Sequence, residues 1–350
     1  MTTLPSTHDC IGCASCPGFA GYEKELIQRT REFMGDVKWK RLEAICCKLG
    51  SSPCHLTMEV VTGQYDMTRR ALFNDGRSMT IRLGMPSYSF MHASRDMKME
   101  LRSEVATMKF FKARTSIPVP EIYHFEPDEH DIGAPYFIMG YIPGEIAFDG
   151  HNQTNDPLYG LGTREQDQNF RRQLAAIQVE LASIKFDKIG SLYENQETGE
   201  FYIGPDSETG QGPWGSSLEY YRYLANETLQ NCLRYAPEDT KDDISFSLPV
   251  IFERLVAMYT EESSIPGPFG LTHETFGASK TLVNEQFDIM TFIRYRGFLS
   301  GPIELQAQFP LFSRTGDTTA IPRRNQASCN QEKQTCKAQD RRVQAHGSGA

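Results

Sequence analysis

The stretch GAPYFIMGYIPG at residues 133–144 joins two parts of the chain that have different patterns. Residues 136–141 form a short apolar and aromatic run, which is typical of a buried strand. Ile142, Pro143 and Gly144 interrupt this run, and Pro and Gly together predict a turn or hinge. We therefore expect the architecture to change at this point.

Upstream of the hinge, the sequence predicts short strands and helices. Strands are expected at 56–62 and 79–83, and Asp75-Gly76 between them is a strong hairpin signal. A helix is expected at 99–113, where apolar residues recur at helical spacing before two prolines end it. Another single helix is expected over 22–48, ahead of a glycine. This part is therefore expected to be rich in strands.

Downstream of the hinge, the pattern is mostly helical. An apolar stripe from Leu174 predicts a helix that reaches about Lys185. Further elements are a loop or hairpin at 195–217, helices near 218–234 and 248–259, and two short strands within 282–293. Strands first and helices later predict the α+β class with two lobes.

The predicted division of the chain has four parts. They are an N-terminal extension with a helix (1–50), a small β-rich N-lobe (51–142), a mainly helical C-lobe (143–312) and a polar tail (313–350). The tail has a single large aliphatic residue after position 322, Val343, and cannot bury enough apolar surface to offset its chain entropy. We therefore expect the tail to be disordered.

Composition excludes several function classes. A net charge of -9 argues against an overall surface for nucleic acid or anionic lipid, and no apolar run approaches a membrane span of about 18 residues. The N-terminal residues lack the pattern of a secretory signal peptide, which predicts a cytoplasmic location. Nine cysteines in a chain of 350 residues are then expected to be mostly reduced thiols.

Several segments carry a family pattern. They are LRSEVATMKF (101–110), TSIPVPEIY (115–123), residues 133–144, QVELASIKFDKIGSLY (178–193), GPWGSSLEYY (212–221), GPFGLTHETFG (267–277) and GPIEL (301–305). Together they resemble the fungal branch of the aminoglycoside phosphotransferase and choline-kinase-like family. The resemblance implies a bilobal, protein-kinase-like fold. Active members of such a family transfer the γ-phosphoryl group of ATP to a hydroxyl of a small molecule, which makes ATP the candidate cofactor.

The resemblance implies roles for two residues near the nucleotide. Arg82 falls where the family places a phosphate-contacting cation on a strand, and Glu104 falls where the partner carboxylate lies on the next helix. Without the resemblance, they read as a solvated strand-end arginine and a surface glutamate. Residues 63–65 lie where a nucleotide-covering loop belongs, but their single glycine fits an ordinary turn equally well.

The catalytic segment departs from the family pattern of His-x-Asp with an Asn five positions later. Thr275 replaces the catalytic aspartate, Lys280 replaces the metal-binding asparagine, and Arg294 replaces the aspartate that binds Mg²⁺. Mg²⁺ requires oxygen ligands, and neither an ammonium nor a guanidinium group has a lone pair to offer. The substitutions therefore argue against Mg²⁺ binding. His273, the first residue of the pattern, is expected to support this loop structurally.

Our leading interpretation is a pseudokinase that has lost Mg²⁺-dependent transfer and binds, as candidate ligands, a nucleotide or a small molecule. The alternative is an active ATP-dependent phosphotransferase in which Glu274 serves as the rescuing base. Lys280 and Arg294 could also contact nucleotide phosphates directly and replace the charge of the metal. These substitutions could also be drift without a function, and a third interpretation is a decayed gene product with no stable fold. The family's further C-lobe helices have no counterpart after GPIEL, so the acceptor site is expected to be incomplete.

The spacing Cys10-x2-Cys13-x2-Cys16 is the best metal-like pattern in the chain. A fourth ligand is missing nearby, although one of Cys46, Cys47 and Cys54 could complete a zinc tetrad in space. We favour free thiols over a metal site.

Overall fold

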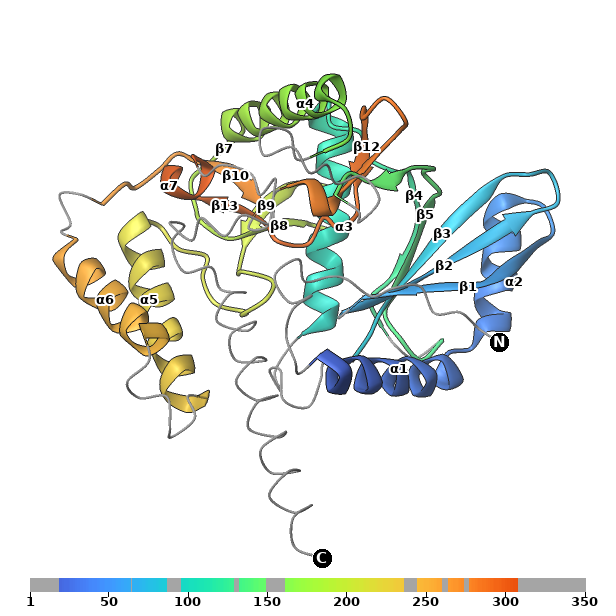
Figure 1. Cartoon of the computed structure of the whole chain (residues 1–350), viewed down its shortest axis with the longest axis horizontal. Coiled ribbons are helices and arrows are strands. Elements are labelled where there is room, and N and C mark those ends of the chain that lie inside the picture. The colour runs from blue at the N-terminus through green and yellow to red at the C-terminus, as the bar shows by residue number, and fades with distance from the viewer. Residues whose placement is uncertain are drawn as a thin grey trace, which may run out of the picture. The chain divides into compact units, whose positions relative to one another are not determined.

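The computed structural model describes residues 19–63, 65–86, 96–128, 132–148, 161–235, 244–259, 264–273 and 277–307 (Figure 1). Its contacts form two compact units, of which the first contains Glu32–Pro213 and Pro268–Ser313 and the second contains Trp214–Gly267. The predicted α+β class is confirmed. The predicted limits of the extension, the lobes and the tail stay predictions, and the whole tail (313–350) lies outside the described residues.

An antiparallel sheet of five strands, in the order β1-β2-β3-β5-β4, dominates the first unit (Figure 1). Its strands are β1 (Cys54–Thr62), β2 (Asp66–Phe73), β3 (Ser78–Gly84), β4 (Ile122–Glu126) and β5 (Tyr136–Gly140). The turn between β2 and β3 contains the predicted Asp75-Gly76, and Gly76 has a φ of 86°, which favours glycine. β5 ends at Gly140, ahead of the predicted hinge, where the backbone is irregular.

One face of this sheet packs on helix α2 (Trp39–Gly50). The prediction of one helix over 22–48 is wrong, because α1 (Phe19–Asp36) ends before α2 begins. Gly35 and the β-branched Val37 both have low helix propensity. Val37 is buried in the core, and the backbone N–H of Lys38 donates to the carbonyl of Ile132 at 3.0 Å instead of continuing a helix.

The central strand β3 is buried on both faces, so its alternation divides its side chains between two environments. Ile81 and Leu83 belong to the apolar cluster that includes α2. Arg82 lies between them in sequence and is therefore directed to the opposite face. There it lies in register with Phe137 of β5, with its guanidinium 5.6 Å from the centroid of that ring.

Helix α3 (Met97–Arg114) carries the carboxylates of this opposite environment. Asp96 caps its N-terminus by accepting from the backbone N–H groups of Lys98 and Met99 at 3.0 and 3.1 Å. Glu100 and Glu104 are four residues apart and therefore lie on one face of α3. Both are buried, at 4% and 5% exposure.

The rest of the first unit consists of helices and short strands around a second apolar cluster. Its helices are α4 (Arg164–Ser183), η3 (Ala278–Lys280) and α7 (Ile303–Gln306). Its strands are β6 (Glu145–Ile146), β7 (Lys185–Phe186), β8 (Ser191–Glu194), β9 (Phe201–Gly204), β10 (Phe269–His273), β11 (Thr281–Val283), β12 (Ile289–Phe292) and β13 (Phe298–Gly301). The β11–β12 hairpin matters most for the site, because β12 leads directly into residues 293–297.

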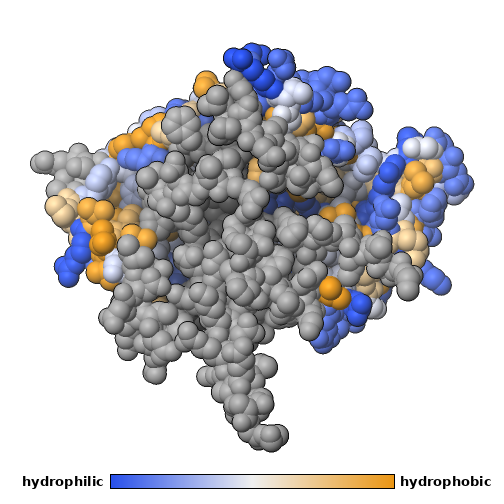
Figure 2. All heavy atoms as spheres, in the orientation of Figure 1, coloured by the Kyte–Doolittle hydropathy of each residue, from blue (hydrophilic) through white to orange (hydrophobic). Residues whose placement is uncertain are grey.

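The second unit contains helices α5 (Ser217–Tyr235) and α6 (Ile244–Met258), which pack against each other. α6 exposes Leu248, Ile251, Leu255 and Met258, and Figure 2 shows apolar surface where this helix lies. No helix in the described ranges has both the length and the apolar character needed to cross a membrane.

Candidate functional site

The site begins with a buried ion pair between β3 and α3. Nη1 of Arg82 donates to Oε1 of Glu104 at 2.8 Å, and each side chain is only 6% exposed. The structure therefore brings together the two residues that the sequence assigned to one pair. Their role in nucleotide binding stays a prediction.

The same pair fastens the segment that follows β12. Nη2 of Arg82 donates to the carbonyl of Ile293, and the backbone N–H of Tyr295 donates to Oε1 of Glu104 at 3.0 Å. The hydroxyl of Tyr295 donates to the carbonyl of Pro118 at 3.0 Å. Residues 293–295 are thus held against β3 and α3 by backbone and side-chain hydrogen bonds.

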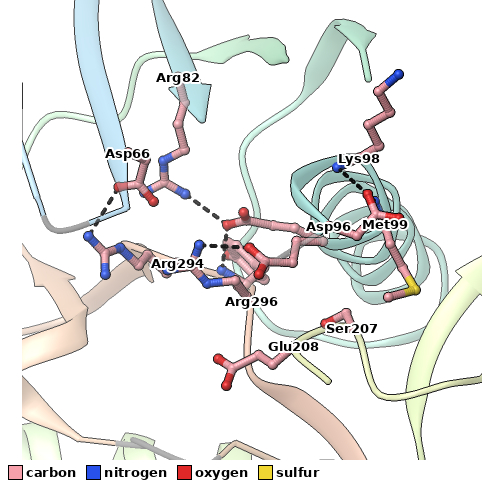
Figure 3. A network of polar contacts seen from close by, with 12 residues as sticks. Asp66, Arg82, Asp96, Lys98, Met99, Ser207, Glu208, Arg294 and Arg296 are labelled. Carbon is pink, nitrogen blue, oxygen red and sulfur yellow. Dashed lines mark hydrogen bonds and ion pairs between the residues drawn. The ribbon is translucent and has the colours of Figure 1, made fainter. Parts of the chain in front are cut away.

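Two more arginines from this segment form ion pairs with carboxylates of the N-terminal part of the unit. Nη2 of Arg294 lies 3.0 Å from Oδ1 of Asp66, and Nη1 of Arg296 lies 3.2 Å from Oε2 of Glu100. Arg294 and Asp66 face each other in Figure 3. The ring of Tyr65 lies under the Arg296 guanidinium, 4.5 Å from its centre, which is a cation–π contact.

These three ion pairs form one network, which we call the arginine clamp: Arg82–Glu104, Arg294–Asp66 and Arg296–Glu100. Burial alone would lower the pKa of Arg296, but the Glu100 and Asp66 carboxylates outweigh it and raise this pKa. Three positive charges meet three carboxylates in the clamp, so the network is close to neutral and has little net attraction for a cation or an anion.

His273 ends β10 beside the clamp and is buried. Burial, with a smaller contribution from the charge of Lys280, lowers its pKa to about 3. Hydrogen bonding to the backbone of Arg296 and Arg294 opposes that shift. Its ring packs edge-on against Phe298, with the centroids 4.5 Å apart. His273 is therefore neutral near pH 7 and packed against the segment that carries the clamp.

A backbone hydrogen bond brings Lys280 next to the residue that precedes Arg294. The N–H of Ile293 donates to the carbonyl of Lys280 at 2.8 Å. Their side chains nevertheless differ in what the structure shows. Lys280 is half-buried, and its charge acts on His273, whereas Arg294 is engaged by Asp66. Glu274 and Thr275, the candidate base and the degenerate aspartate position, lie outside the described residues.

The turn between β1 and β2, where the resemblance implies a nucleotide-covering loop, is short. The N–H of Gly63 donates to the carbonyl of Asp66 at 2.9 Å, which closes the turn between β1 and β2. Residue 64 lies outside the described residues. Tyr65 and Asp66 leave this turn to meet Arg296 and Arg294, so the segment after β12 holds the turn directly.

A pocket lies beside the clamp, with about 350 Å³ of space free of protein atoms, including its part open to solvent. Apolar side chains and clamp residues share its lining, namely Tyr65, Asp66, Arg82, Met97, Glu100, Leu101, Glu104, Pro135, Phe137 and Arg296, with Gly84. The clamp side chains therefore form part of the wall of this pocket.

The clamp does not fit Mg²⁺. Each of its carboxylates already binds an arginine, and a guanidinium offers no lone pair. Within the described ranges, no group of three or more His, Cys, Asp or Glu side chains could hold a metal ion. The candidate metal cysteines Cys10, Cys13 and Cys16 lie outside those ranges. Cys46, Cys47 and Cys54 are free cysteines near one another in the chain.

Sequence reasoning missed Asp66, Glu100 and Arg296, and it named Tyr65 only as part of a candidate nucleotide-covering loop. One local signal was available for Glu100, because its spacing of four residues from Glu104 places both carboxylates on one helix face. No local pattern marks Asp66 as the partner of Arg294, since 228 positions separate them.

The fold has the architecture of small-molecule phosphotransferases. The family described as "Phosphotransferase enzyme family" matches residues 72–274, more than half of the chain, and the chain belongs to this family. A solved structure of a "putative aminoglycoside phosphotransferase" from Ralstonia eutropha superposes with a TM-score of 0.51 at 13% identity. The match covers 86% of this chain and 81% of that one. The predicted family and kinase-like fold are confirmed.

Curated fungal relatives carry the name "Altered inheritance of mitochondria protein 9, mitochondrial". The Candida tropicalis relative is 24% identical over 183 residues, or 50% of this chain and 25% of its own length. The Saccharomyces cerevisiae relative is 31% identical over 100 residues, or 28% of this chain and 15% of its own length. The chain thus spans a quarter or less of these relatives. Because they are named as mitochondrial proteins, the predicted cytoplasmic location is wrong.

Proposed function

We propose that this member of the phosphotransferase family is a pseudokinase that does not carry out Mg²⁺-dependent phosphoryl transfer. The observation that carries the proposal is the ion pair of Arg294 with Asp66, at 3.0 Å and with side-chain exposures of 13% and 9%. By its sequence motif, Arg294 stands at the position where active members have an aspartate for Mg²⁺. Its guanidinium cannot ligate the ion, and it is already paired.

The energetics support the same conclusion. A carboxylate of the clamp can ligate a cation only by leaving its arginine, and breaking such a pair costs about 2–5 kcal/mol, depending on its burial. The arginine would then also repel the divalent cation, by about 8 kcal/mol at 4 Å and an effective dielectric constant of 20. Both terms oppose metal binding where Arg294 and Asp66 lie.

A thermal-shift titration of the full chain with ATP, with and without Mg²⁺, tests the proposal. We expect the ATP-induced change in melting temperature to be the same under both conditions, and no ADP to form. The control variant Arg254→Ala should show the same ATP-induced change in melting temperature as the wild type. It removes an arginine that is 80% exposed and far in sequence from the clamp. A shift that depends on Mg²⁺, or phosphoryl transfer abolished by Glu274→Gln, would overturn the proposal.

The triple substitution Thr275→Asp, Lys280→Asn and Arg294→Asp restores the family pattern. Without metal, this variant should melt at a lower temperature than the wild type, because Asp66 loses its partner and meets a second carboxylate. Adding millimolar Mg²⁺ should recover part of that loss, whereas the wild type should not respond. A triple variant that ignores Mg²⁺ would show that these positions do not form the family's metal site.

Metal-free binding of ATP by Lys280 and Arg294 remains part of the proposal. Asp66 already engages Arg294, so ATP phosphates would compete with this carboxylate. Asp66→Asn removes the competing charge while it keeps the size of the side chain. We expect this variant to show a larger ATP-induced thermal shift than the wild type, and an unchanged shift would exclude Arg294 from the nucleotide contact.

We also propose a mitochondrial location for this chain. Support comes from the names of its fungal relatives, of which the chain matches a quarter or less. Imaging of a C-terminal fluorescent fusion together with a mitochondrial stain tests this proposal, and diffuse fluorescence would contradict it.

A further inference from the structure

Outside the clamp, the thiols of Cys47 and Cys54 face each other where α2 ends and β1 begins. The Sγ atoms of Cys47 and Cys54 are 3.3 Å apart. The backbone N–H of Cys54 also lies 3.3 Å from Sγ of Cys47. Both residues are half-buried, whereas the neighbouring Cys46 is completely buried in the core under the sheet. Two different elements thus present a pair of accessible sulfur atoms to each other.

The turn between these elements is tied down on both sides. The N–H of Asn74 donates to the carbonyl of Pro53 at 3.1 Å, and Arg77 donates to the carbonyl of Gly50 at 2.8 Å. A Cβ at Gly50 would lie 2.1 Å from the ring of Phe73, so only glycine lets the end of α2 lie this close to β2. The approach of α2 and β1 is therefore fixed by contacts that do not involve the two sulfur atoms.

We propose that Cys47 and Cys54 are a redox modification site that forms a reversible disulfide and joins α2 to β1. Closing the bond requires the sulfur atoms to move from 3.3 Å to about 2.05 Å apart. The oxidant that we name is glutathione disulfide or a protein disulfide of the same chemistry. This inference does not depend on the proposed loss of phosphoryl transfer.

The exchange proceeds in two steps. The Cys47 thiolate attacks one sulfur of glutathione disulfide, breaks its S–S bond and releases one glutathione thiolate. The Cys54 thiolate then attacks the Cys47 sulfur of the mixed disulfide and releases the second glutathione. The two protein thiols lose two protons and two electrons, and glutathione disulfide is reduced to two molecules of glutathione.

Burial distinguishes the roles of the three neighbouring cysteines. It raises the pKa of Cys46 to about 12, so this thiol in the core is a poor nucleophile. Burial also raises the pKa of Cys54, and its hydrogen bond with Cys47 raises it further. We assign the first attack to Cys47. Cys54 then resolves the mixed disulfide, because its sulfur is held 3.3 Å from that of Cys47. Because both steps need a thiolate, the disulfide should form faster as the pH rises from 7 to 9.

The test uses the full chain, reduced and then exposed to glutathione disulfide, followed by acid quenching, alkylation and peptide mapping. We expect a linked pair of peptides containing Cys47 and Cys54, and no lasting glutathione adduct on either of these two cysteines, because ring closure is intramolecular. Cys54→Ser should instead accumulate glutathione on Cys47. In Cys47→Ser, glutathione should attach to Cys54 at least about tenfold more slowly than it attaches to Cys47 in Cys54→Ser.

Cys232→Ser is the matched control, because it removes a half-buried cysteine on α5 and should leave the linked peptides unchanged. Circular dichroism of each variant checks that it is folded. The oxidised wild type should melt about 2–4 °C above the reduced form, with no such gain in Cys47→Ser.

Two results would overturn the inference. One is that Cys47 and Cys54 of the folded wild type stay fully alkylatable at an oxidant concentration that completely glutathionylates Cys232. The other is that Cys54 links to a cysteine other than Cys47. Mapping of the wild type alone distinguishes these results, so the test does not depend on the variants being stable.

Discussion

The ion pairs Arg82–Glu104 and Arg294–Asp66 have similar geometry but a different relation to the family pattern. The first joins a strand cation to a helix carboxylate, as the pattern implies, at 2.8 Å. The second, at 3.0 Å, places an arginine where the pattern has a metal-binding aspartate. Both hold the segment after β12 against the N-terminal sheet and α3. Two buried ion pairs thus hold this segment in place, and the proposed loss of the metal site concerns the second pair alone.

Removing the carboxylate of the first pair should have the largest effect. Glu104→Ala leaves Arg82 buried without its counter-charge and removes the acceptor of the Tyr295 N–H. We expect the free energy of unfolding to fall by about 3–5 kcal/mol, as measured by urea denaturation. Glu104→Gln, which keeps an acceptor oxygen, should lose less. A loss below 1 kcal/mol in Glu104→Ala would mean that the pair is dispensable for the fold.

The second pair should cost less to break, because its side chains are somewhat more exposed. Asp66→Ala should lower the free energy of unfolding by about 2–3 kcal/mol. Asp128→Ala is the matched control, since it removes the carboxylate of an ion pair with Lys98 at 2.7 Å whose side chains are more than 40% exposed. That control should lose less than about 1 kcal/mol. Equal losses in the two variants would contradict a role for burial.

The buried His273, which packs against the segment that carries the clamp, makes the free energy of unfolding depend on pH. Its folded pKa of about 3 lies below the unfolded value of about 6.5, so the unfolded chain binds the extra proton between these values. Its contribution to stability is therefore complete above pH 6.5 and is lost as the pH falls toward 3. The expected slope is up to about 1.4 kcal/mol per pH unit.

Urea denaturation from pH 7 to pH 4 measures this slope. In His273→Gln the slope should become shallower, because the group that takes up the proton is gone. His55→Gln removes an exposed histidine and should keep the wild-type slope. Identical slopes in the wild type and His273→Gln would contradict the assignment.

The smallest effect is expected at the aromatic contact of the clamp. Tyr65→Leu removes the ring that lies 4.5 Å from the Arg296 guanidinium and should lower the free energy of unfolding by about 1 kcal/mol. Tyr65→Phe keeps the ring face and should lie within about 0.5 kcal/mol of the wild type. If Tyr65→Phe loses as much as Tyr65→Leu, the hydroxyl rather than the ring face makes the contribution.

Local patterns predicted much of the fold. The hairpin turn, the β3 strand and helix α3 follow from turn residues and apolar spacing within a few positions of each other. The single helix predicted over 22–48 failed because the chain is held by a contact with Ile132, which is remote in sequence. The location was predicted wrongly because composition and the absence of a secretory pattern carry little information about an organelle.

The sequence by itself determined the family, the alternation that turns Arg82 away from Ile81 and Leu83, and the presence of Thr275, Lys280 and Arg294 where the family resemblance implies other residues. These properties depend on residue identity and short spacing. Only the tertiary structure decided which carboxylate each arginine meets. Arg294 and Asp66 are 228 positions apart, and their approach depends on the register of the sheet and the path of the chain after β12. Local preferences contain no information about such a long-range contact.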